Sequence, residues 1–400
     1  MTRDRPTLAT LLRVFIRLGL TSFGGPVAHL GYFREEFVVR RRWLDEARYA
    51  DLVALCQFLP GPASSQVGMG IGALCRGPAG ALAAWLGFTL PSAAALVALA
   101  YGLEAFAGAV PPGVLEGLKV VAVAVVAQAV WGIGRSQCPD RGRAPLALLA
   151  AAGVVAWPGT GGQMAAIILG ALAGWRLLPG EAAPAEQVAA VDQSHRHLPL
   201  VFLAGFFVLL GVLPLIAWQV GGLELVLLDK FYRAGALVFG GGHVVLPLLE
   251  AEVVPPGLVG REAFLAGYGA AQAVPGPLFT FAAYLGAMIG VGAGRPPWLI
   301  GLLCLGAVFL PSGLLILGVL PYWDALRRQP QMQAALRGVN AAVVGLLLAA
   351  LYDPVWTSAI RTPAHFALTL GAFGLLAFWK VPPWLVVLLS AVAGWLLSVN

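Results

Sequence analysis

The chain has 400 residues, of which 59% are hydrophobic and 11% are charged, and its net charge is +6. Because average soluble proteins carry about 25% charged residues, this composition excludes a soluble globule and predicts an all-α polytopic membrane protein. The basic residues lie in short loops between apolar segments, where the positive-inside rule expects them, so the charge does not indicate a nucleic-acid partner.

The first 178 residues are expected to form one membrane repeat. It opens with an apolar stretch over 7–39, interrupted at Gly24-Gly25-Pro26, and a second stretch over 49–75 is interrupted at Pro60-Gly61-Pro62. Proline removes a backbone donor and glycine permits sharp turns, so each interruption predicts a break between two short helices. Apolar segments able to span the membrane follow near residues 79–109, 113–134, 144–157 and 162–178.

An extended polar stretch over 179–197 is interpreted as the linker between two halves. The apolar segment 198–220 has no counterpart in the first half. A second repeat is expected over 221–400, with the same two broken stretches followed by spans near 296–322, 332–352, 364–379 and 383–399. The pattern predicts about nine full spans and four hairpins at helix breaks.

Sequence motifs are duplicated between the halves. Phe15-x-Arg17-x-Gly19-x-x-x-Phe23-Gly24-Gly25 returns as Phe231-x-Arg233-x-Gly235-x-x-x-Phe239-Gly240-Gly241. Gln57-x-x-Pro60-Gly61-Pro62 returns as Gln272-x-x-Pro275-Gly276-Pro277, and Pro91-Ser92 returns as Pro311-Ser312. Duplicated membrane units with discontinuous helices are typical of secondary transporters.

The two repeats are expected to have inverted topologies. If each broken stretch is a re-entrant hairpin, each half crosses the membrane an even number of times. The single unpaired segment 198–220 then gives the second half the opposite orientation in the membrane. The distribution of positive charge supports the inverted topology, because the loop 34–48 carries five arginines and its counterpart 250–262 carries one, Arg261. The first loop is then cytoplasmic. A parallel repeat, in which the broken stretches span fully as kinked helices, is the alternative.

The helix breaks form a candidate anion site. A helix that begins at a break directs its unpaired N–H groups and the positive end of its dipole at whatever fills the break. The residues expected around the substrate are Gly24, Gly25, Gln57, Pro60, Gly61, Pro62, Ser64, Ser65, Gly240, Gly241, Gln272, Pro275, Gly276, Pro277 and Thr280. Kinks that only shape the bundle are the alternative, and the glutamines could bond the broken backbone instead.

Cationic residues also occur in matched pairs. Arg17 and Arg233 lie seven residues before the first glycine of each Gly-Gly break, and an arginine within an apolar helix is a functional candidate. Lys119 and Arg337 form a second pair near the starts of apolar spans. These residues suit an anion better than a cation. Snorkelling to the headgroups, or neutralisation of Lys119 by Glu116, is the alternative.

Four further residues are candidates for proton coupling. His29 and His243 follow the two Gly-Gly breaks, and Glu36 and Glu252 match across the repeat. Imidazole titrates near neutral pH, and desolvation can move a carboxyl group toward that range. The alternative for Glu36 is an ion pair with Arg40 within the loop.

The same motifs resemble the chromate ion transporter family, in its long two-domain form with antiparallel halves. The segments that carry the resemblance are 22–29, 40–44, 55–62, 88–92, 238–243 and 271–280. The resemblance implies a carrier in the bacterial cytoplasmic (inner) membrane that extrudes chromate, driven by the membrane potential or an ion gradient. Because chromate and sulfate are similar tetrahedral dianions, the resemblance leaves the physiological substrate open.

We therefore predict a secondary transporter that exports chromate by alternating access, with sulfate as a competing or related substrate. The alternatives are an oxyanion channel, a carrier without chromate specificity, and a membrane scaffold that transports nothing. The four cysteines form no C-x-x-C pair, and no nucleotide-binding loop, H-E-x-x-H or G-x-S-x-G occurs, so we predict no metal, no cofactor and no enzymatic activity. The expected partners are the oxyanion and the lipid bilayer, and a homodimer is compatible with the sequence.

Overall fold

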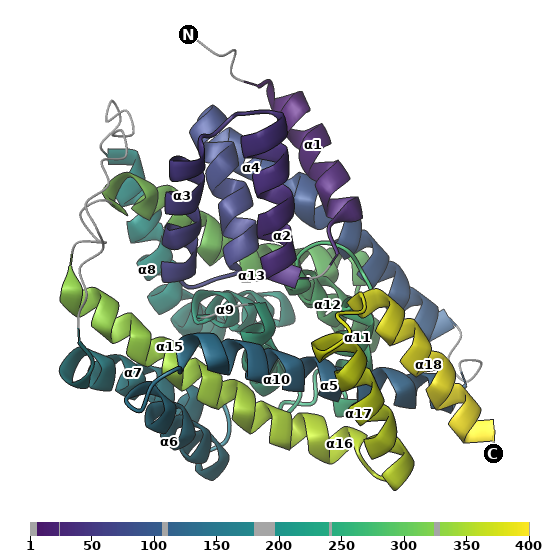
Figure 1. Cartoon of the computed structure of the whole chain (residues 1–400). Helices are drawn as coiled ribbons and strands as arrows, with labels where there is room; N and C mark the ends of the chain where they lie inside the picture. Colours follow the sequence, from purple (N-terminus) through teal and green to yellow (C-terminus); the bar gives the residue numbers. More distant parts are fainter. Residues whose placement is uncertain are drawn as a thin grey trace.

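The computed structural model describes residues 6–23, 25–105, 111–179, 197–239, 242–323 and 329–399, and every regular element within these ranges is a helix. The helices are α1 Leu8–Thr21, α2 Gly25–Arg34, η1 Glu35–Arg40, α3 Glu46–Phe58, α4 Ala63–Ala105, α5 Pro112–Gln137, α6 Arg143–Ala156, α7 Thr160–Leu177, α8 His197–Val220, α9 Leu223–Ala236, η2 Gly242–Val244, α10 Val245–Val253, α11 Arg261–Ala271, η3 Leu278–Thr280, α12 Phe281–Gly292, α13 Pro297–Val319, η4 Leu320–Tyr322, α15 Pro330–Ala350, η5 Leu351–Trp356, α16 Thr357–Ala359, α17 Pro363–Ala377 and α18 Pro383–Val399 (Figure 1).

Several of these helices have the length and composition of membrane spans. Five are long and apolar enough to cross a bilayer: Ala63–Ala105, Gly113–Gln137, His197–Val220, Pro297–Tyr322 and Pro330–Ala359. Only 11% of the most apolar 18-residue stretch of α8 is buried, and Trp218 on this helix is 82% exposed. Large apolar side chains exposed along a helix of this length are compatible with lipid rather than water. The predicted class, an all-α membrane protein, is confirmed.

The element α4 consists of two helices. Arg76 and Gly77 have non-helical backbone angles, and a Cβ atom built on Gly72 would lie 2.2 Å from the carbonyl oxygen of Gly80. In a continuous helix, residues eight positions apart are separated by about 12 Å. The chain therefore folds back on itself near Gly77, close to the boundary that hydropathy places between residues 75 and 79.

Helix interruptions occur at all four expected places. They lie between α1 and α2, between α3 and α4, between α9 and η2, and between α11 and η3. Of the residues expected at these breaks, Gly24, Gly240 and Gly241 lie outside the described residues, as does 180–196 of the predicted linker. All four interruptions lie in the first part of each half of the chain.

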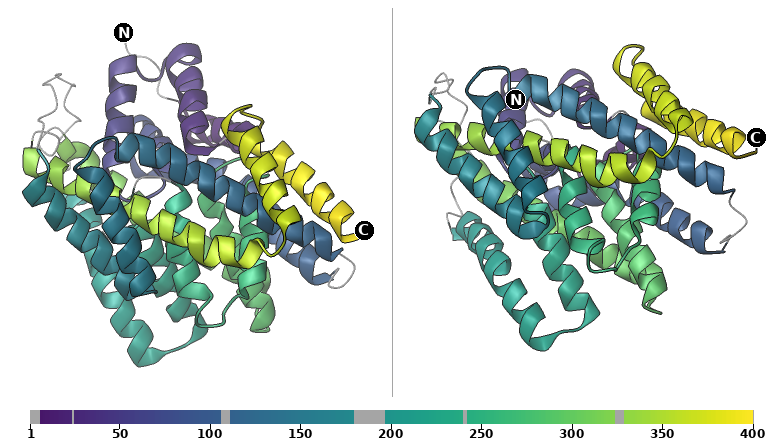
Figure 2. Two further views of the ribbon diagram at one scale, coloured as in Figure 1. Left: turned by 60° about the horizontal axis from the view of Figure 1, so that its bottom comes forward. Right: turned by 90° about the horizontal axis from the view of Figure 1, so that it is seen from below.

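Helices from the two ends of the sequence exchange partners. α5 packs against α17 and α18, whereas α15 packs against α6 and α7 (Figure 2). At the crossing of α15 and α7, a Cβ atom on Gly338 would lie 2.0 Å from the carbonyl oxygen of Gly170, so the two backbones touch. Such close crossings between small residues are a usual way for helices to associate in membranes.

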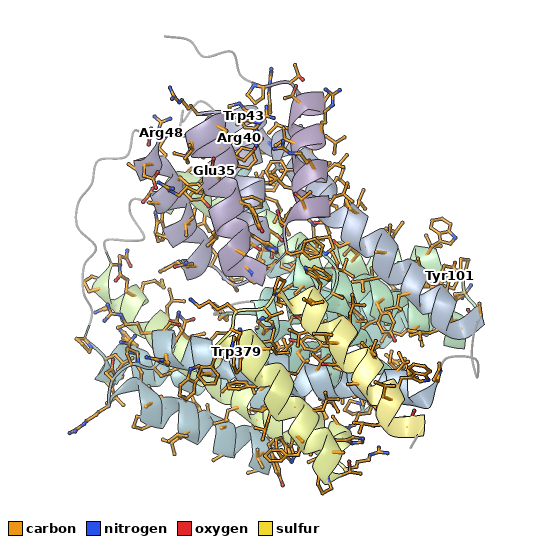
Figure 3. All side chains as sticks on the ribbon, turned by 45° about the vertical axis from the view of Figure 1, so that its right-hand side comes forward. Glu35, Arg40, Trp43, Arg48, Tyr101 and Trp379 are labelled. Atoms are coloured by element: carbon orange, nitrogen blue, oxygen red, sulfur yellow. The ribbon has the colours of Figure 1, made fainter. Side chains whose placement is uncertain are left out.

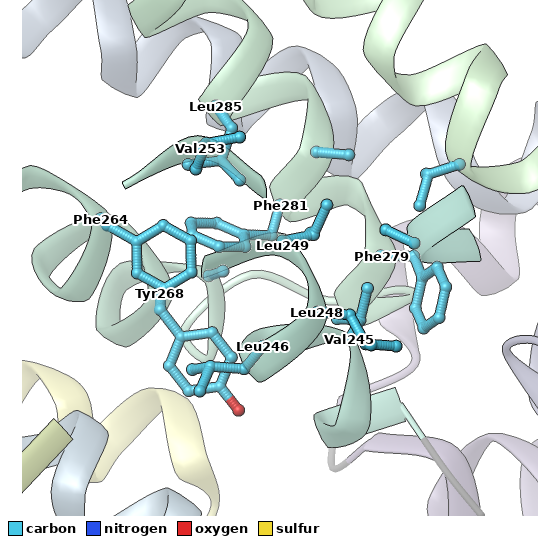
Figure 4. Close-up of a cluster of buried hydrophobic side chains, with 14 of the residues drawn as sticks. Val245, Leu246, Leu248, Leu249, Val253, Phe264, Tyr268, Phe279, Phe281 and Leu285 are labelled. Atoms are coloured by element: carbon cyan, nitrogen blue, oxygen red, sulfur yellow. The ribbon is translucent and has the colours of Figure 1, made fainter. Parts of the chain in front are cut away.

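The core of the second half surrounds the short helices α10, α11 and α12. Figure 4 shows Leu249, Phe264 and Phe281 close together in this cluster, where the rings of Phe264 and Phe281 meet edge to face. A separate cluster joins α1 to the first helix of α4, and includes the stacked rings of Phe15 and Phe37. These two apolar clusters fix the helices whose ends form the breaks.

Candidate functional site

A cavity of about 710 Å³ lies where the four helix interruptions converge. Gly25 and Pro26 line it from the first interruption, Gly61 from the second, His243 from the third and Gln272 from the fourth. One face of α5 closes the cavity opposite the breaks. The volume is in the range of small-molecule binding sites.

Each Pro-Gly-Pro break is hydrogen-bonded to the break of the other half. The backbone N–H of Gly61 donates to the carbonyl oxygen of Val238 at 2.6 Å. The backbone N–H of Gly276 donates to the carbonyl oxygen of Ser22 at 2.9 Å. Val238 and Ser22 occupy the same position in the duplicated motif, two residues before the first glycine. The two bonds satisfy backbone groups that a membrane interior would otherwise leave unpaired.

The geometry of these two breaks requires glycine. Gly61 has φ +125° and Gly276 has φ +96°, in the region that side-chain-bearing residues rarely adopt. A Cβ atom on Gly61 would meet the hydroxyl oxygen of Ser312, and one on Gly276 would lie 2.7 Å from that of Ser92. The serines of the duplicated Pro-Ser pairs therefore lie directly against the breaks of the opposite half.

Side chains also bond backbone carbonyl groups of the two Pro-Gly-Pro breaks. The Nε2 atom of Gln66 donates to the carbonyl oxygen of Pro60 at 2.7 Å. In the second half, the hydroxyl group of Thr280 donates to the carbonyl oxygen of Pro277 at 2.7 Å. The hydroxyl oxygen of Ser65 is buried and has no hydrogen-bond partner among the described residues. The amide that satisfies the broken backbone is thus Gln66, whereas Gln57 lines the cavity.

His29 ties the two breaks of the first half together. Its Nδ1 atom lies 3.3 Å from the hydroxyl oxygen of Ser64, and its Nε2 atom lies 3.2 Å from the carbonyl oxygen of Ser22. The side chain is 1% exposed and packs edge-on against Phe88. Both ring nitrogens are therefore engaged, which is the arrangement of a structural histidine.

His243 is placed differently. It lines the cavity, and its Nδ1 atom lies 2.8 Å from the hydroxyl oxygen of Tyr268. No hydrogen bond of its Nε2 atom occurs among the described residues. The two histidines that follow the Gly-Gly breaks thus have different environments in the two halves.

The wall contributed by α5 contains polar residues that the motif analysis did not single out. Gln128, Ser136 and Gln137 line the cavity within an otherwise apolar helix. The Nδ2 atom of Asn340 on α15 donates to the Oε1 atom of Gln137 at 3.2 Å. The four-residue and eight-residue spacings from Gln128 to Gly132 and Ser136 place these positions on one helical face. The sequence signal that could have identified this wall is the recurrence of polar residues, Gln128 and Ser136, on one face of an apolar span.

Among the described residues, no arginine, lysine, aspartate or glutamate lines the cavity. Arg17 instead forms an ion pair with Glu36 at 2.5 Å. Arg233 forms ion pairs with Asp229 at 2.8 Å and with Glu252 at 3.4 Å. Arg17 therefore pairs with Glu36, and Arg233 pairs with the matching Glu252. Neither arginine is among the described residues that line the cavity.

Glu36 lies in η1, directly after α2, and η1 is not among the five helices that are long and apolar enough to cross a bilayer. It is 3% exposed and is bonded by Arg41 at 2.5 Å and Arg40 at 3.3 Å, in addition to Arg17. Figure 3 shows Arg40 at this end of the molecule, close to Trp43 and Arg48. Burial disfavours the ionised carboxylate, but the hydrogen bonds from Arg41 and Arg17 outweigh burial and hold the pKa of Glu36 below its ordinary value.

Three other candidates lie away from the cavity lining. Glu252 is 3% exposed and is bonded by Lys230 at 2.8 Å as well as by Arg233. Lys119 is 2% exposed and pairs with Glu116 at 2.7 Å, as the alternative interpretation of the sequence expects. Arg337 donates to the carbonyl oxygen of Pro179 at 3.0 Å. Within the described residues, no group of three or more His, Cys, Asp or Glu side chains could hold a metal ion.

Comparison with known proteins identifies relatives over the whole length of the chain. The chain is 29% identical to a chromate transport protein of Pseudomonas aeruginosa, over 96% of this chain and 91% of the relative. It is 27% identical to a probable chromate transport protein of Synechococcus elongatus, over 97% and 95% of the two chains. It is 26% identical to a chromate transport protein of Cupriavidus metallidurans, over 97% and 92%. No solved structure matches the chain.

The family model described as "Chromate transporter" matches two separate segments, residues 9–175 and 225–395. Together these segments cover most of the chain, and α8 lies between them. The two matched segments contain the two sets of duplicated motifs and all four helix breaks that converge on the cavity. The chain belongs to the chromate transporter family.

Proposed function

We propose that the chain is a secondary active carrier that exports chromate across the bacterial cytoplasmic membrane. The observation that carries the proposal is the meeting of four helix breaks, two from each family-matched segment, around one cavity of about 710 Å³. Transporters commonly bind substrate where discontinuous helices from two repeats meet. The names of the relatives supply the substrate, chromate.

The chemistry of the cavity suits a tetrahedral dianion. Gln57, Gln128, Gln272 and Ser136 offer neutral hydrogen-bond donors, and the part of the lining that the structure describes has no carboxylate to repel an anion. The helix that begins at Ala63 adds the partial positive charge of its N-terminus. Sulfate has the same shape and charge as chromate, so we propose it as a competing substrate.

Inverted repeats supply the mechanism in this proposal. The two reciprocal hydrogen bonds, from Gly61 to Val238 and from Gly276 to Ser22, are what two repeats related by a two-fold axis in the membrane plane would form. The exchange of partners by α5 and α15 has the same two-fold character. Rocking of one half against the other around the cavity would then expose it alternately to the two sides of the membrane.

The test is uptake of radiolabelled chromate into everted membrane vesicles, because export from the cell becomes uptake in this preparation. We expect saturable uptake that is inhibited by sulfate and abolished by an uncoupler. Vesicles lacking the protein are the control. Chromate uptake equal to that of the control vesicles would contradict the proposal.

An anion channel is the second candidate, because the cavity could open to both sides at once. The two are separated by counterflow: a carrier exchanges labelled for unlabelled chromate across a vesicle, whereas a channel passes steady current without exchange. The orientation of the repeats is tested separately with reporter fusions at Arg41 and Pro256. Opposite sides are expected for the two positions, and the same side would exclude inversion.

A further inference from the structure

The cavity is lined by a histidine, a side chain that becomes positively charged when it takes up a proton. Apart from the thiol of Cys56, His243 is the one ionisable side chain among the described residues that line the cavity. Arg17, Arg233 and Lys119 are each engaged with carboxylates elsewhere. A dianion that leaves water for a cavity within the membrane must be compensated by nearby positive charge or by many hydrogen bonds. His243 is therefore the group best placed to supply that charge.

The contacts of His243 leave one ring nitrogen for a ligand. Nδ1 is held by the Tyr268 hydroxyl group at 2.8 Å, and Nε2 has no partner among the described residues. The ring of Tyr268 is buried in the apolar cluster of the second half, and its hydroxyl group points out of that cluster (Figure 4). Because the tyrosine ring is fixed, its hydroxyl group orients the imidazole ring and can accept a hydrogen bond from Nδ1–H.

The matched histidine of the first half cannot play the same part. Both ring nitrogens of His29 are engaged, by Ser64 and by Ser22, and the ring is 1% exposed. The His29 ring therefore has no nitrogen left for a ligand. Of the two matched histidines, His29 is thus a structural residue and His243 faces the cavity.

The charged groups around His243 are held by other partners. η2 packs against α10, α15 and η3. On α10, Glu252 is paired with Lys230 and Arg233, and Glu250 lies 3.8 Å from Arg261. On α15, Arg337 donates to a backbone carbonyl group, and η3 carries no charged residue. None of the ion pairs among the described residues includes His243, so a bound anion would be its electrostatic partner.

We infer that the oxyanion and a proton bind together, with the proton on the imidazole ring of His243. Nε2–H then donates to an oxygen of the oxyanion, and Nδ1–H donates to Tyr268. The inference rests on the proposed oxyanion transport and adds a proton that binds together with the substrate. Linkage makes the effect reciprocal: binding of the anion favours protonation, and lower pH favours binding of the anion.

The experiment is isothermal titration calorimetry of chromate with the purified full-length protein at about pH 8, where a histidine of ordinary pKa is neutral and free chromate carries no proton. Repeating the titration in two buffers with different heats of ionisation gives the number of protons taken up. For the wild type we expect between about half a proton and one proton per chromate bound.

His243→Gln and His243→Asn should take up none and bind chromate about 10- to 100-fold more weakly, as for a lost charge-assisted hydrogen bond. His197→Gln, at the exposed start of α8, is the matched control and should match the wild type.

The outcomes separate the inference from the proposed function. Chromate binding by the wild type without proton uptake would overturn the inference and leave the proposed carrier intact. Unchanged proton uptake in both variants would also overturn the inference. Absence of any chromate binding by the wild type would contradict the proposed function itself. If the variants do not remain monodisperse in detergent, the proton count of the wild type still decides the question.

Discussion

The backbone N–H of Gly61 donates to the carbonyl oxygen of Val238 at 2.6 Å, across the boundary between the two family-matched segments. Its counterpart joins Gly276 to Ser22 at 2.9 Å. Each bond couples the loop between two short helices in one half to the loop between two short helices in the other. A change of conformation at one break is therefore transmitted to the opposite half without any side chain in between.

Alanine at Gly61 or Gly276 should destabilise the protein and abolish chromate uptake. Both glycines have a positive φ, and the added Cβ atoms would collide with the hydroxyl groups of Ser312 and Ser92. Strain of this kind costs about 1–3 kcal/mol. The measurement is thermal unfolding in detergent together with vesicle uptake. Gly153→Ala is the control, since nothing lies within 4 Å of the added atom. Unfolding and uptake of Gly61→Ala equal to the wild type would show that the break geometry is not required.

The buried carboxylate of Glu36 should stabilise the protein in a pH-dependent manner. Because its pKa is lowered in the folded state, its contribution is present above about pH 4.3, the unfolded value, and is lost as pH falls through the folded pKa. Glu36→Gln should therefore lower the unfolding temperature at pH 7, and the difference from the wild type should close below about pH 4. The measurement is thermal unfolding in detergent across this range.

The neighbouring Glu35, which is exposed, supplies the matched control for that experiment. Glu35→Gln should unfold at nearly the wild-type temperature at every pH, because exposed charges contribute little. A pH-independent difference between Glu36→Gln and the wild type would mean that the arginines around Glu36 do not recognise its charge.

Replacement of Arg17 or Arg233 by alanine should reduce stability more than affinity for chromate. Both arginines pair with buried carboxylates, and the cavity is lined without them. Loss of one partner from such a pair costs about 1–3 kcal/mol, because the carboxylate keeps other cationic partners. Unfolding temperature and the chromate dissociation constant should be measured on the same samples. A loss of affinity of 10-fold or more at unchanged stability would return the arginines to the binding site.

The duplicated motifs predicted where helices break but not what fills the space between them. Proline and glycine determine local backbone geometry, so the interruption around Pro60-Gly61-Pro62 can be inferred from the residues themselves. The pairing of that break with Val238 depends on how the halves meet, and no spacing within one half encodes it. The same holds for the reversal at Gly77, which hydropathy marks as a boundary without showing that the chain folds back.

The sequence predicted which break residues line the candidate site, but it did not predict where the charged residues lie. Gln57, Gly61 and Gln272 were expected from the motifs and do line the cavity. Arg17 was attractive because an arginine in an apolar helix needs an explanation, but sequence cannot distinguish a ligand contact from a buried ion pair with Glu36. The contribution of α5 was missed, because Gln128 and Gln137 have no counterpart in the duplicated motifs.

The matched glutamines provide the most direct test of the cavity as the binding site. Gln57→Leu and Gln272→Leu each remove one neutral donor from the lining while keeping a side chain of similar volume. A hydrogen bond to a charged group contributes about 1.5–3 kcal/mol, so each variant should bind chromate about 10- to 100-fold more weakly. Gln219→Leu, on the exposed face of α8, is the control and should bind as the wild type does. If both cavity variants retained wild-type affinity while remaining folded, the oxyanion would have to bind elsewhere, and the convergence of the four breaks would be a feature of folding rather than of recognition.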